Sequence, residues 1–160
     1  MADYTFRPVQ NDDLPMLADW LRQPLVAEWW TDTERQIAEL PATLAEPRLT
    51  LLIIQHDGQP IAYAQISLAA VWQAPHYDAL GMPDGTLALD VFAGPDGVGH
   101  GGEWLDALAR HLLADAPALI IDPDPTNLRA IRAYGKAGFH GDTVIANEEG
   151  QPARMMTRRR

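Results

Sequence analysis

The sequence predicts a single domain of the α/β (α+β) class that takes in residues 1–160. Strand-like segments and segments with helical spacing of apolar residues follow one another along the chain. A length of 160 residues is usual for one domain with one sizeable core. The sequence contains no repeat, linker or low-complexity segment that would divide it, so we expect one domain.

The first part of the chain predicts a strand and two helices. Residues 4–9 alternate weakly, which is typical of a strand. Residues 11–13 can cap a helix whose apolar positions run from Leu14 to Leu21, and Pro24 is expected to end it. Thr33 with Gln36 has the pattern of a capping box for a second helix, which Pro41 should bend or divide.

A hairpin and a long connection follow. Residues 49–54 predict a buried strand, 56–59 a tight turn, and 61–68 the partner strand. The connection 69–85, which includes His76 and Tyr77, is long for a compact domain. Two interpretations stay open for it, a lid over a binding site or an uninvolved excursion on the surface.

The last part of the chain predicts three further strand segments around two helices. Residues 86–92 read as a central strand, and the glycines of 97–102 lead into a helix with Leu105, Leu108, Leu112 and Leu113 at core spacing. A terminal hairpin is expected from 143–146 and 153–157, and 158–160 are expected to be a solvated end.

Residues 118–139 hold the strongest local signals. Residues 118–121 form a short apolar run that suits a buried strand, and two prolines then stiffen a turn. Thr126 or Asn127 can cap the helix that follows, and Gly138 is placed for a left-handed C-terminal cap. Asn127 and Tyr134 are about two turns apart and therefore share a face of this helix.

Composition excludes several classes of chemistry. The chain contains no cysteine, which rules out disulfides, thiolate metal sites and a cysteine acyl-enzyme. The one serine, Ser67, is not flanked by the glycines of a nucleophile elbow. The histidines do not stand at metal-ligand spacing with carboxylates, so we expect no metal.

Charge and hydropathy bear on partners and location. A formal net charge of -10 argues against nucleic-acid binding. The negative charge can attract a cationic small molecule, or it can simply keep the protein in solution. No apolar run reaches the ~20 residues that span a bilayer, and the N-terminus is not a signal peptide, so we expect a cytoplasmic protein without a membrane partner.

A glycine-rich segment precedes the helix at 105–113. The segment Asp96-Gly97-Val98-Gly99-His100-Gly101-Gly102 offers backbone N–H groups at a helix N-terminus, where a phosphate binds well. The segment lacks the lysine of a P-loop, and no dinucleotide fingerprint stands at the first strand. Glycine clusters are also common in ordinary turns, so this pattern is weak alone.

The stretch Ile121-Asp122-Pro123-Asp124-Pro125-Thr126-Asn127-Leu128-Arg129-Ala130-Ile131-Arg132-Ala133-Tyr134-Gly135-Lys136-Ala137-Gly138-Phe139, with the glycines above, resembles the GNAT acyltransferases. It is most similar to the aminoglycoside 6'-N-acetyltransferases, and the similarity extends to 26–30 and 58–65. The resemblance implies a GNAT fold, in which about four helices flank a mixed, mostly antiparallel sheet of six to seven strands.

The resemblance also implies an activity. The expected reaction moves an acetyl group from acetyl-CoA to a primary amine of a cationic small molecule, directly in a ternary complex. An aminoglycoside-like amino sugar is the favoured acceptor, which would make antibiotic resistance the role. Two alternatives stay open: acyl transfer to another amine, such as a siderophore lysine or a peptide, and a non-catalytic CoA-binding module. Monomer and homodimer are both compatible with the sequence.

Two catalytic roles follow from the resemblance. Tyr134 matches a general acid that protonates the leaving thiolate, although a helix tyrosine can also pack its ring inward. Asp90 matches an active-site carboxylate that takes a proton from the attacking ammonium, directly or through water. The oxyanion would be met by backbone N–H groups near Val91.

The resemblance assigns binding roles to further residues. Those expected at the cofactor are Val91, Phe92, Gly97, Val98, Gly99, His100, Gly101, Gly102, Asn127, Ala130 and Tyr134. Those expected at the acceptor are Glu28, Trp29, Trp30, Tyr63, Gln65, Asp90 and Asp122. Plainer interpretations exist for three of these: a helix cap for Asn127, a turn carboxylate for Asp122, and core cover for the paired tryptophans. Asp96 departs from the family, which usually has Gln or Arg there, so we expect modest affinity for the donor.

Overall fold

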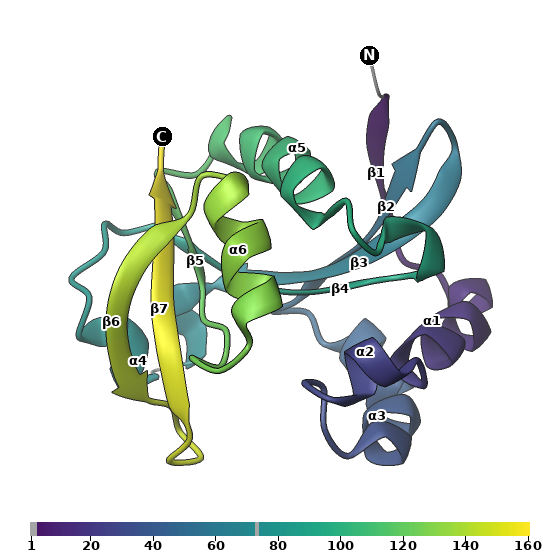
Figure 1. The fold of residues 1–160 in the computed structure, drawn as a ribbon, viewed down its shortest axis with the longest axis horizontal. Helices are drawn as coiled ribbons and strands as arrows, with labels where there is room; N and C mark the ends of the chain where they lie inside the picture. The colour runs from purple at the N-terminus through teal and green to yellow at the C-terminus, as the bar shows by residue number, and fades with distance from the viewer. Residues whose placement is uncertain (1–2, 73) are drawn as a thin grey trace. The chain divides into compact units, whose positions relative to one another are not determined.

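The computed structural model describes residues 3–72 and 74–160, which contain seven strands and six α-helices (Figure 1). The strands are β1 (Tyr4–Pro8), β2 (Thr50–His56), β3 (Gln59–Leu68), β4 (Leu87–Ala93), β5 (Ala118–Ile121), β6 (His140–Ala146) and β7 (Pro152–Arg159). Their order in the sheet is β1-β2-β3-β4-β5-β7-β6. β4 and β5 are parallel, whereas β1–β2, β5–β7 and β6–β7 are antiparallel. The predicted mixed, mostly antiparallel sheet is confirmed.

Four of the helices lie close to where the sequence predicts them, whereas the short helices at Pro24–Ala27 and Pro75–Asp78 are not predicted. The α-helices are α1 (Leu14–Leu21), α2 (Pro24–Ala27), α3 (Thr33–Ala45), α4 (Pro75–Asp78), α5 (Gly101–Leu113) and α6 (Leu128–Lys136). Short 3-10 helices occupy Asn11–Asp13, Ala69–Trp72 and Pro95–Gly97. Among the described residues, no helix is both long and apolar enough to cross a bilayer.

The chain forms two compact units, one of Met1–Gln65 with Val91–Val98 and the other of Ile66–Asp90 with Gly99–Arg160. The single domain of residues 1–160 stays a prediction. Since each unit has its own apolar core, we describe them separately.

An aromatic cluster fills the core of the first unit. The rings of Tyr63 and Phe92 stack at 4.7 Å, and Trp30 meets Phe92 edge-on at 5.0 Å. Trp20 also meets Phe92 edge-on, with ring centroids 6.5 Å apart. Aromatic pairs in such geometries add to the free energy gained from burial alone, so this cluster fixes β3 and the end of β4 against α1.

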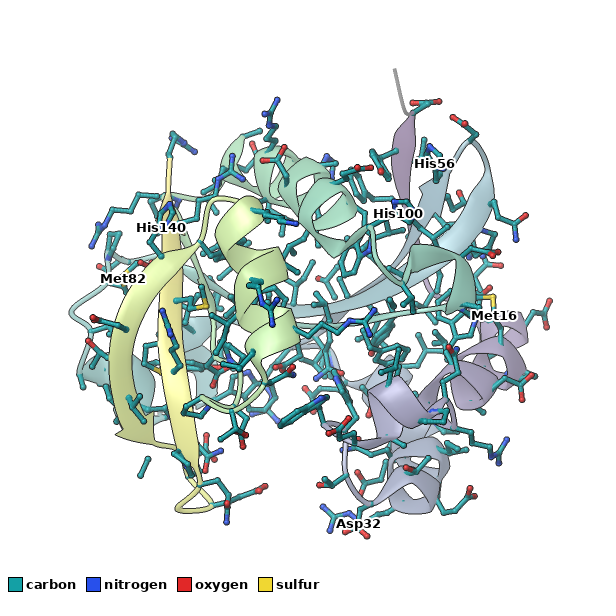
Figure 2. All side chains as sticks on the ribbon, viewed as in Figure 1. Met16, Asp32, His56, Met82, His100 and His140 are labelled. Atoms are coloured by element: carbon teal, nitrogen blue, oxygen red, sulfur yellow. The ribbon has the colours of Figure 1, made fainter. Side chains whose placement is uncertain are left out.

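Two details of the first unit differ from the sequence-based expectations. The predicted capping box at Thr33 is wrong, because the residue that caps α3 is Asp32, with a φ of 60° and no side-chain hydrogen bond to the helix (Figure 2). Pro41 does not divide α3, which continues to Ala45. Pro41 is exposed, so water can satisfy the carbonyl that its missing N–H leaves unpaired.

Helices α5 and α6 pack against each other in the second unit (Figure 1). Their close approach requires glycine, since a Cβ on Gly102 would lie 2.9 Å from the Cβ of Lys136 and one on Gly101 would lie 3.3 Å from that of Ala133. The C-terminus of α6 has the predicted left-handed glycine, Gly138, with a φ of 88°.

This end of α6 is a Schellman motif. The Phe139 N–H donates to the Tyr134 carbonyl at 3.0 Å, and the Gly138 N–H donates to the Gly135 carbonyl at 3.1 Å. The motif satisfies carbonyls that the helix leaves open, and it directs the chain into β6. The position of Tyr134 is therefore fixed from both sides, by helix packing and by the helix end.

The expected solvated end at 158–160 is wrong for Arg158, which is half-buried, while Arg159 and Arg160 are exposed. Arg158 Nη1 donates to Asp106 Oδ1 at 2.7 Å and to the Ala137 carbonyl at 2.6 Å. Arg160 Nε donates to the Leu113 carbonyl at 2.8 Å, at the C-terminus of α5. These guanidinium groups satisfy helix-end carbonyls, a favourable place for a cation.

Candidate active site

Two carboxylates lie side by side where β4 and β5 stop pairing. The strands are parallel and their last pair is Leu89 with Ile121. Asp90 and Asp122 are the next residue of each strand, so their side chains leave the same face of the sheet at neighbouring positions. The topology brings together two acidic residues that are 32 positions apart (122 minus 90).

Asp122 lies against α4. Its Oδ2 lies 3.2 Å from His76 Nε2, and the Tyr77 hydroxyl lowers the pKa of the same carboxyl. The two α4 rings lie against each other, with centroids 4.2 Å apart. The His76 and Asp122 side chains are only 5% and 15% exposed, so this contact is largely screened from water.

The two carboxylates perturb each other. Desolvation, and after it the negative charge of Asp122, raise the pKa of Asp90, while His76 acts in the opposite direction. Asp90 nevertheless exposes much of its side chain to solvent. Water can therefore reach this carboxylate. The negative charge of Asp122 acts whether or not Asp90 is buried, so it is the better supported cause of the raised pKa of Asp90.

The pKa of Asp122 is raised as well, chiefly by desolvation. Its own backbone N–H and the Tyr77 hydroxyl oppose that rise, because hydrogen bonds to a carboxylate favour its charged form. Among the residues that the structure describes, no lysine or arginine forms an ion pair with either carboxylate. The pair is therefore a place of unbalanced negative charge that suits a cationic ligand.

Tyr134 completes this group of side chains. It lies on α6 and is partly exposed. Desolvation raises its pKa, and the charges of Asp90 and Asp122 raise it further. Its phenol is thus protonated at neutral pH and lies within the electrostatic influence of both carboxylates. The structure brings together Asp90, Asp122 and Tyr134 as the sequence leads one to expect, and their catalytic roles stay predictions.

Asn127 is the N-cap of α6. Its Oδ1 accepts a hydrogen bond from the Ala130 N–H at 3.2 Å. Asn127 therefore acts as a helix cap, and this hydrogen bond occupies the backbone N–H of Ala130. A contact of either residue with a cofactor stays a prediction, which would use the Asn127 amide nitrogen or carbonyl.

The glycine segment serves several structural purposes. A Cβ on Gly97 would collide with the Ile61 carbonyl in the first unit, and Gly99 has a φ of 85°. His100 is the N-cap of α5 and makes no side-chain cap hydrogen bond (Figure 2). The first N–H groups of a helix have no partner within the helix, so those of Gly101 and Gly102 can bind an anion.

The predicted acceptor residues of the first unit are mostly engaged in packing. Tyr63 is buried and its hydroxyl donates to Gln65 Oε1 at 3.0 Å. Trp30 is half-buried and packs on the aromatic core, as the plainer interpretation has it. Trp29 is half-buried and Glu28 exposed, which leaves both able to meet a ligand. Their binding roles stay predictions.

The remaining residues assigned to the cofactor lie at the end of β4 and after it. Val91 and Phe92 are buried, so only their backbones can serve a ligand, while Val98 is half-buried. Asp96 is exposed, which allows its carboxylate to stay hydrated.

His76 and Tyr77 are the members of the site that sequence reasoning did not assign. They lie on a four-residue helix inside the long connection, and His76 is 46 positions from its partner Asp122. Pro75 at the start of α4 is the one local signal, since proline suits the first turn of a helix. Across the described residues, no group of three or more histidine, aspartate and glutamate side chains is placed to hold a metal ion.

Comparison with known proteins identifies a family. The acetyltransferase (GNAT) domain family matches residues 9–146. A curated relative, the aminoglycoside N(6')-acetyltransferase type 1 of Klebsiella pneumoniae, is 32% identical over 97% of this chain and 83% of its own length. The structure of AAC(6')-Ib in complex with paromomycin and acetyl-CoA is 31% identical, with a TM-score of 0.78 over 99% of this chain and 94% of that one.

A more distant solved structure shares the fold. The aminoglycoside N(6')-acetyltransferase of Legionella pneumophila is 24% identical, with a TM-score of 0.78 over 98% of this chain and 91% of that one. The sheet order, the parallel β4–β5 pair and the family match over most of the chain agree with one another. This chain belongs to the GNAT acetyltransferase family.

Proposed function

We propose that this protein transfers the acetyl group of acetyl-CoA to a primary amine of an aminoglycoside-like amino sugar, directly in a ternary complex. Two relatives above 30% identity support the substrates, because one is named for the 6'-N-acetylation of aminoglycosides and the other binds paromomycin and acetyl-CoA. The observation that carries the proposal is the carboxylate pair Asp90–Asp122 beside the phenol of Tyr134.

The carboxylate pair is the proposed acceptor site. An amino sugar carries several ammonium groups, and binding one of them between Asp90 and Asp122 relieves the repulsion of two like charges. The net charge of -10 attracts such a molecule from a distance. We assign Asp122 to holding the cation and Asp90 to removing the proton of the attacking amine, directly or through a water molecule.

The raised pKa values fit the two proton transfers. A carboxylate of ordinary pKa, ~3.9, is a weak base toward an ammonium. The raised pKa of Asp90 makes its carboxylate a stronger base. Tyr134 must give a proton to the leaving thiolate, for which its raised pKa is unfavourable. A bound cation offsets the two negative charges that raise it, so acceptor binding itself makes Tyr134 a better acid.

The donor site rests on the N-terminus of α5. We assign the pyrophosphate of acetyl-CoA to the N–H groups of Gly101 and Gly102, where the helix dipole favours an anion. Lys136, the only lysine of the chain, lies beside Gly102 and adds a positive charge there.

A thiol-release assay tests the proposal. Acetyl-CoA is mixed with the protein and with aminoglycosides, polyamines, lysine derivatives and peptides in turn, and free CoA is measured. We expect turnover with aminoglycosides. Turnover with peptides or lysine derivatives alone would replace the acceptor, and CoA binding without turnover on any amine would favour a non-catalytic module.

The role of Tyr134 is tested separately. Tyr134→Phe should slow turnover by about 10²-fold or more, since general acid catalysis contributes on that order, and should leave CoA affinity by calorimetry nearly unchanged. Tyr4→Phe, in β1, is the matched control and should turn over like the parent. Equal rates for both variants would remove Tyr134 from the mechanism.

A further inference from the structure

His76 is a buried side chain that the mechanism above does not use. The residue is 4% exposed, and its Nδ1 makes no hydrogen bond to any described residue, while Nε2 lies 3.2 Å from Asp122 Oδ2. A buried polar atom without a partner costs ~1–3 kcal/mol, so this placement of His76 is not explained by stability.

The chemistry of the contact fixes the direction of the hydrogen bond. An ionised carboxylate can only accept, so Nε2 carries the hydrogen and donates it to Asp122. Desolvation lowers the pKa of His76, which makes the neutral ring with a free Nδ1 lone pair the favoured form. The Tyr77 hydroxyl favours the same charged form, because it lowers the pKa of Asp122.

The two carboxylates therefore have different surroundings. Asp122 accepts a hydrogen bond from His76, and the Tyr77 hydroxyl and its own backbone N–H also lower its pKa. In the chain as described, Asp90 has no hydrogen-bond donor and faces water. When two acidic groups compete for one proton, the group with more donors keeps the negative charge.

We propose that His76 and Tyr77 are positioning residues that hold Asp122 in its ionised form to bind the acceptor ammonium, so that Asp90 is the carboxylate that gains and loses the proton. This inference rests on the proposed function. It gives a role to α4, the short helix within the long connection: its side chains make Asp122 differ from Asp90, so that the two aspartates serve different functions.

Other charged groups act on this arrangement. Asp90 on β4 and Asp122 face each other, Tyr134 on α6 feels both, and Glu148, in the turn between β6 and β7, acts on His76 and Tyr77. Glu148 and Asp90 raise the pKa of His76 and so oppose desolvation. A protonated His76 would donate through the same Nε2, so the hydrogen bond to Asp122 persists in both forms.

The test is the pH dependence of kcat/KM in variants that remove one donor. His76→Leu removes the donated hydrogen bond, and Tyr77→Phe removes the hydroxyl that lowers the pKa of Asp122, so each variant should raise that pKa. The acid limb of the profile should therefore move to higher pH by about one unit, which corresponds to one hydrogen bond to a charged group. His76→Gln, whose amide N–H can reach the place of Nε2, should restore the position of the limb.

A second readout does not depend on turnover. In protein labelled with ¹³C at the aspartate carboxyls, Asp122→Asn and Asp90→Asn identify the two resonances, and each is titrated in the parent and in the variants. Tyr77→Phe should raise the pKa of Asp122, whereas His140→Gln, at an exposed position on β6, should leave it unchanged.

The outcomes separate this inference from the proposed function. A parent protein that acetylates no amine refutes the proposed function, and the titration of Asp122 still decides the inference. An Asp122 pKa that is unmoved in Tyr77→Phe overturns the inference, even if His76→Leu does not fold. So does a shift in His76→Gln as large as in His76→Leu, because packing and not the donated hydrogen would then be responsible.

Discussion

Asp122→Asn should move the acid limb of kcat/KM to lower pH. The substitution keeps the size of the side chain and removes the negative charge beside Asp90. Because that charge raises the pKa of Asp90, its removal should let Asp90 ionise at a lower pH. The α4 variants His76→Leu and Tyr77→Phe should move the limb in the opposite direction. They keep the negative charge of Asp122 but remove groups that stabilise it.

The strand geometry gives the size of the shift. Neighbouring strands lie ~4.8 Å apart, so we take ~5 Å as the separation of the two charges. Two unit charges at that distance interact by ~3.3 kcal/mol at an effective dielectric constant of ~20 and by ~0.8 kcal/mol in water. These energies correspond to ~2.4 and ~0.6 pKa units. Asp90 is open to solvent, so a shift of about one unit is expected.

The assay is thiol release at a series of pH values with a saturating donor and a limiting acceptor. Asp142→Asn, at an exposed position on β6, is the matched control and should reproduce the parent profile. Asp122→Asn should also raise KM for a cationic acceptor, since half of the anionic site is lost. Two results would falsify the idea that the charges of Asp90 and Asp122 interact: an acid limb in Asp122→Asn at the same pH as in the parent, or an acid limb in the parent near the ordinary aspartate pKa of ~3.9.

Three further predictions concern stability. Gly102→Ala should lower the unfolding free energy by ~1–3 kcal/mol through overpacking between α5 and α6, whereas Gly135→Ala, with open space around it, should raise it by up to ~1 kcal/mol in the same denaturant titration. Arg158→Ala should cost ~1–3 kcal/mol, and a double-mutant cycle with Asp106→Asn should show coupling between the two; additive effects would contradict the ion pair. Asp90→Asn should raise Tm at about pH 8 and not at about pH 4. The pKa of Asp90 is raised in the folded state, so the ionised carboxyl lowers stability as the pH rises through that pKa. Equal gains in Tm at both pH values would contradict this.

Local chemistry explains what could be predicted from the sequence. The strand over 118–121, the Asn127 cap and the Gly138 helix end all depend on residues within one or two turns of each other, and each lies where expected. The turn at Asp57 and Gly58 is similar, because both residues adopt the positive φ that a two-residue hairpin loop requires.

Long-range contacts explain what could not be predicted. The contact of His76 with Asp122 joins segments 46 residues apart, and nothing in the sequence of the connection indicates a partner. The termination of α5 and α6 by Arg158 and Arg160 depends on where β7 runs, so an arginine run looked like a free end. Asp32 caps α3 from a left-handed conformation that is uncommon for a residue other than glycine, and sequence patterns favoured the threonine beside it.

The carboxylate pair connects the fold to the choice of substrate. Parallel pairing of β4 with β5 forces Asp90 and Asp122 together, and an acidic chain offers them no lysine or arginine among the described residues. Such a pair is unfavourable until a cation arrives, so part of the binding energy of an ammonium group is the relief of repulsion already present in the free protein. A neutral analogue of the acceptor, with hydroxyls in place of amines, gains none of this relief. Charge should therefore discriminate between acceptors more strongly than the shape of the sugar does.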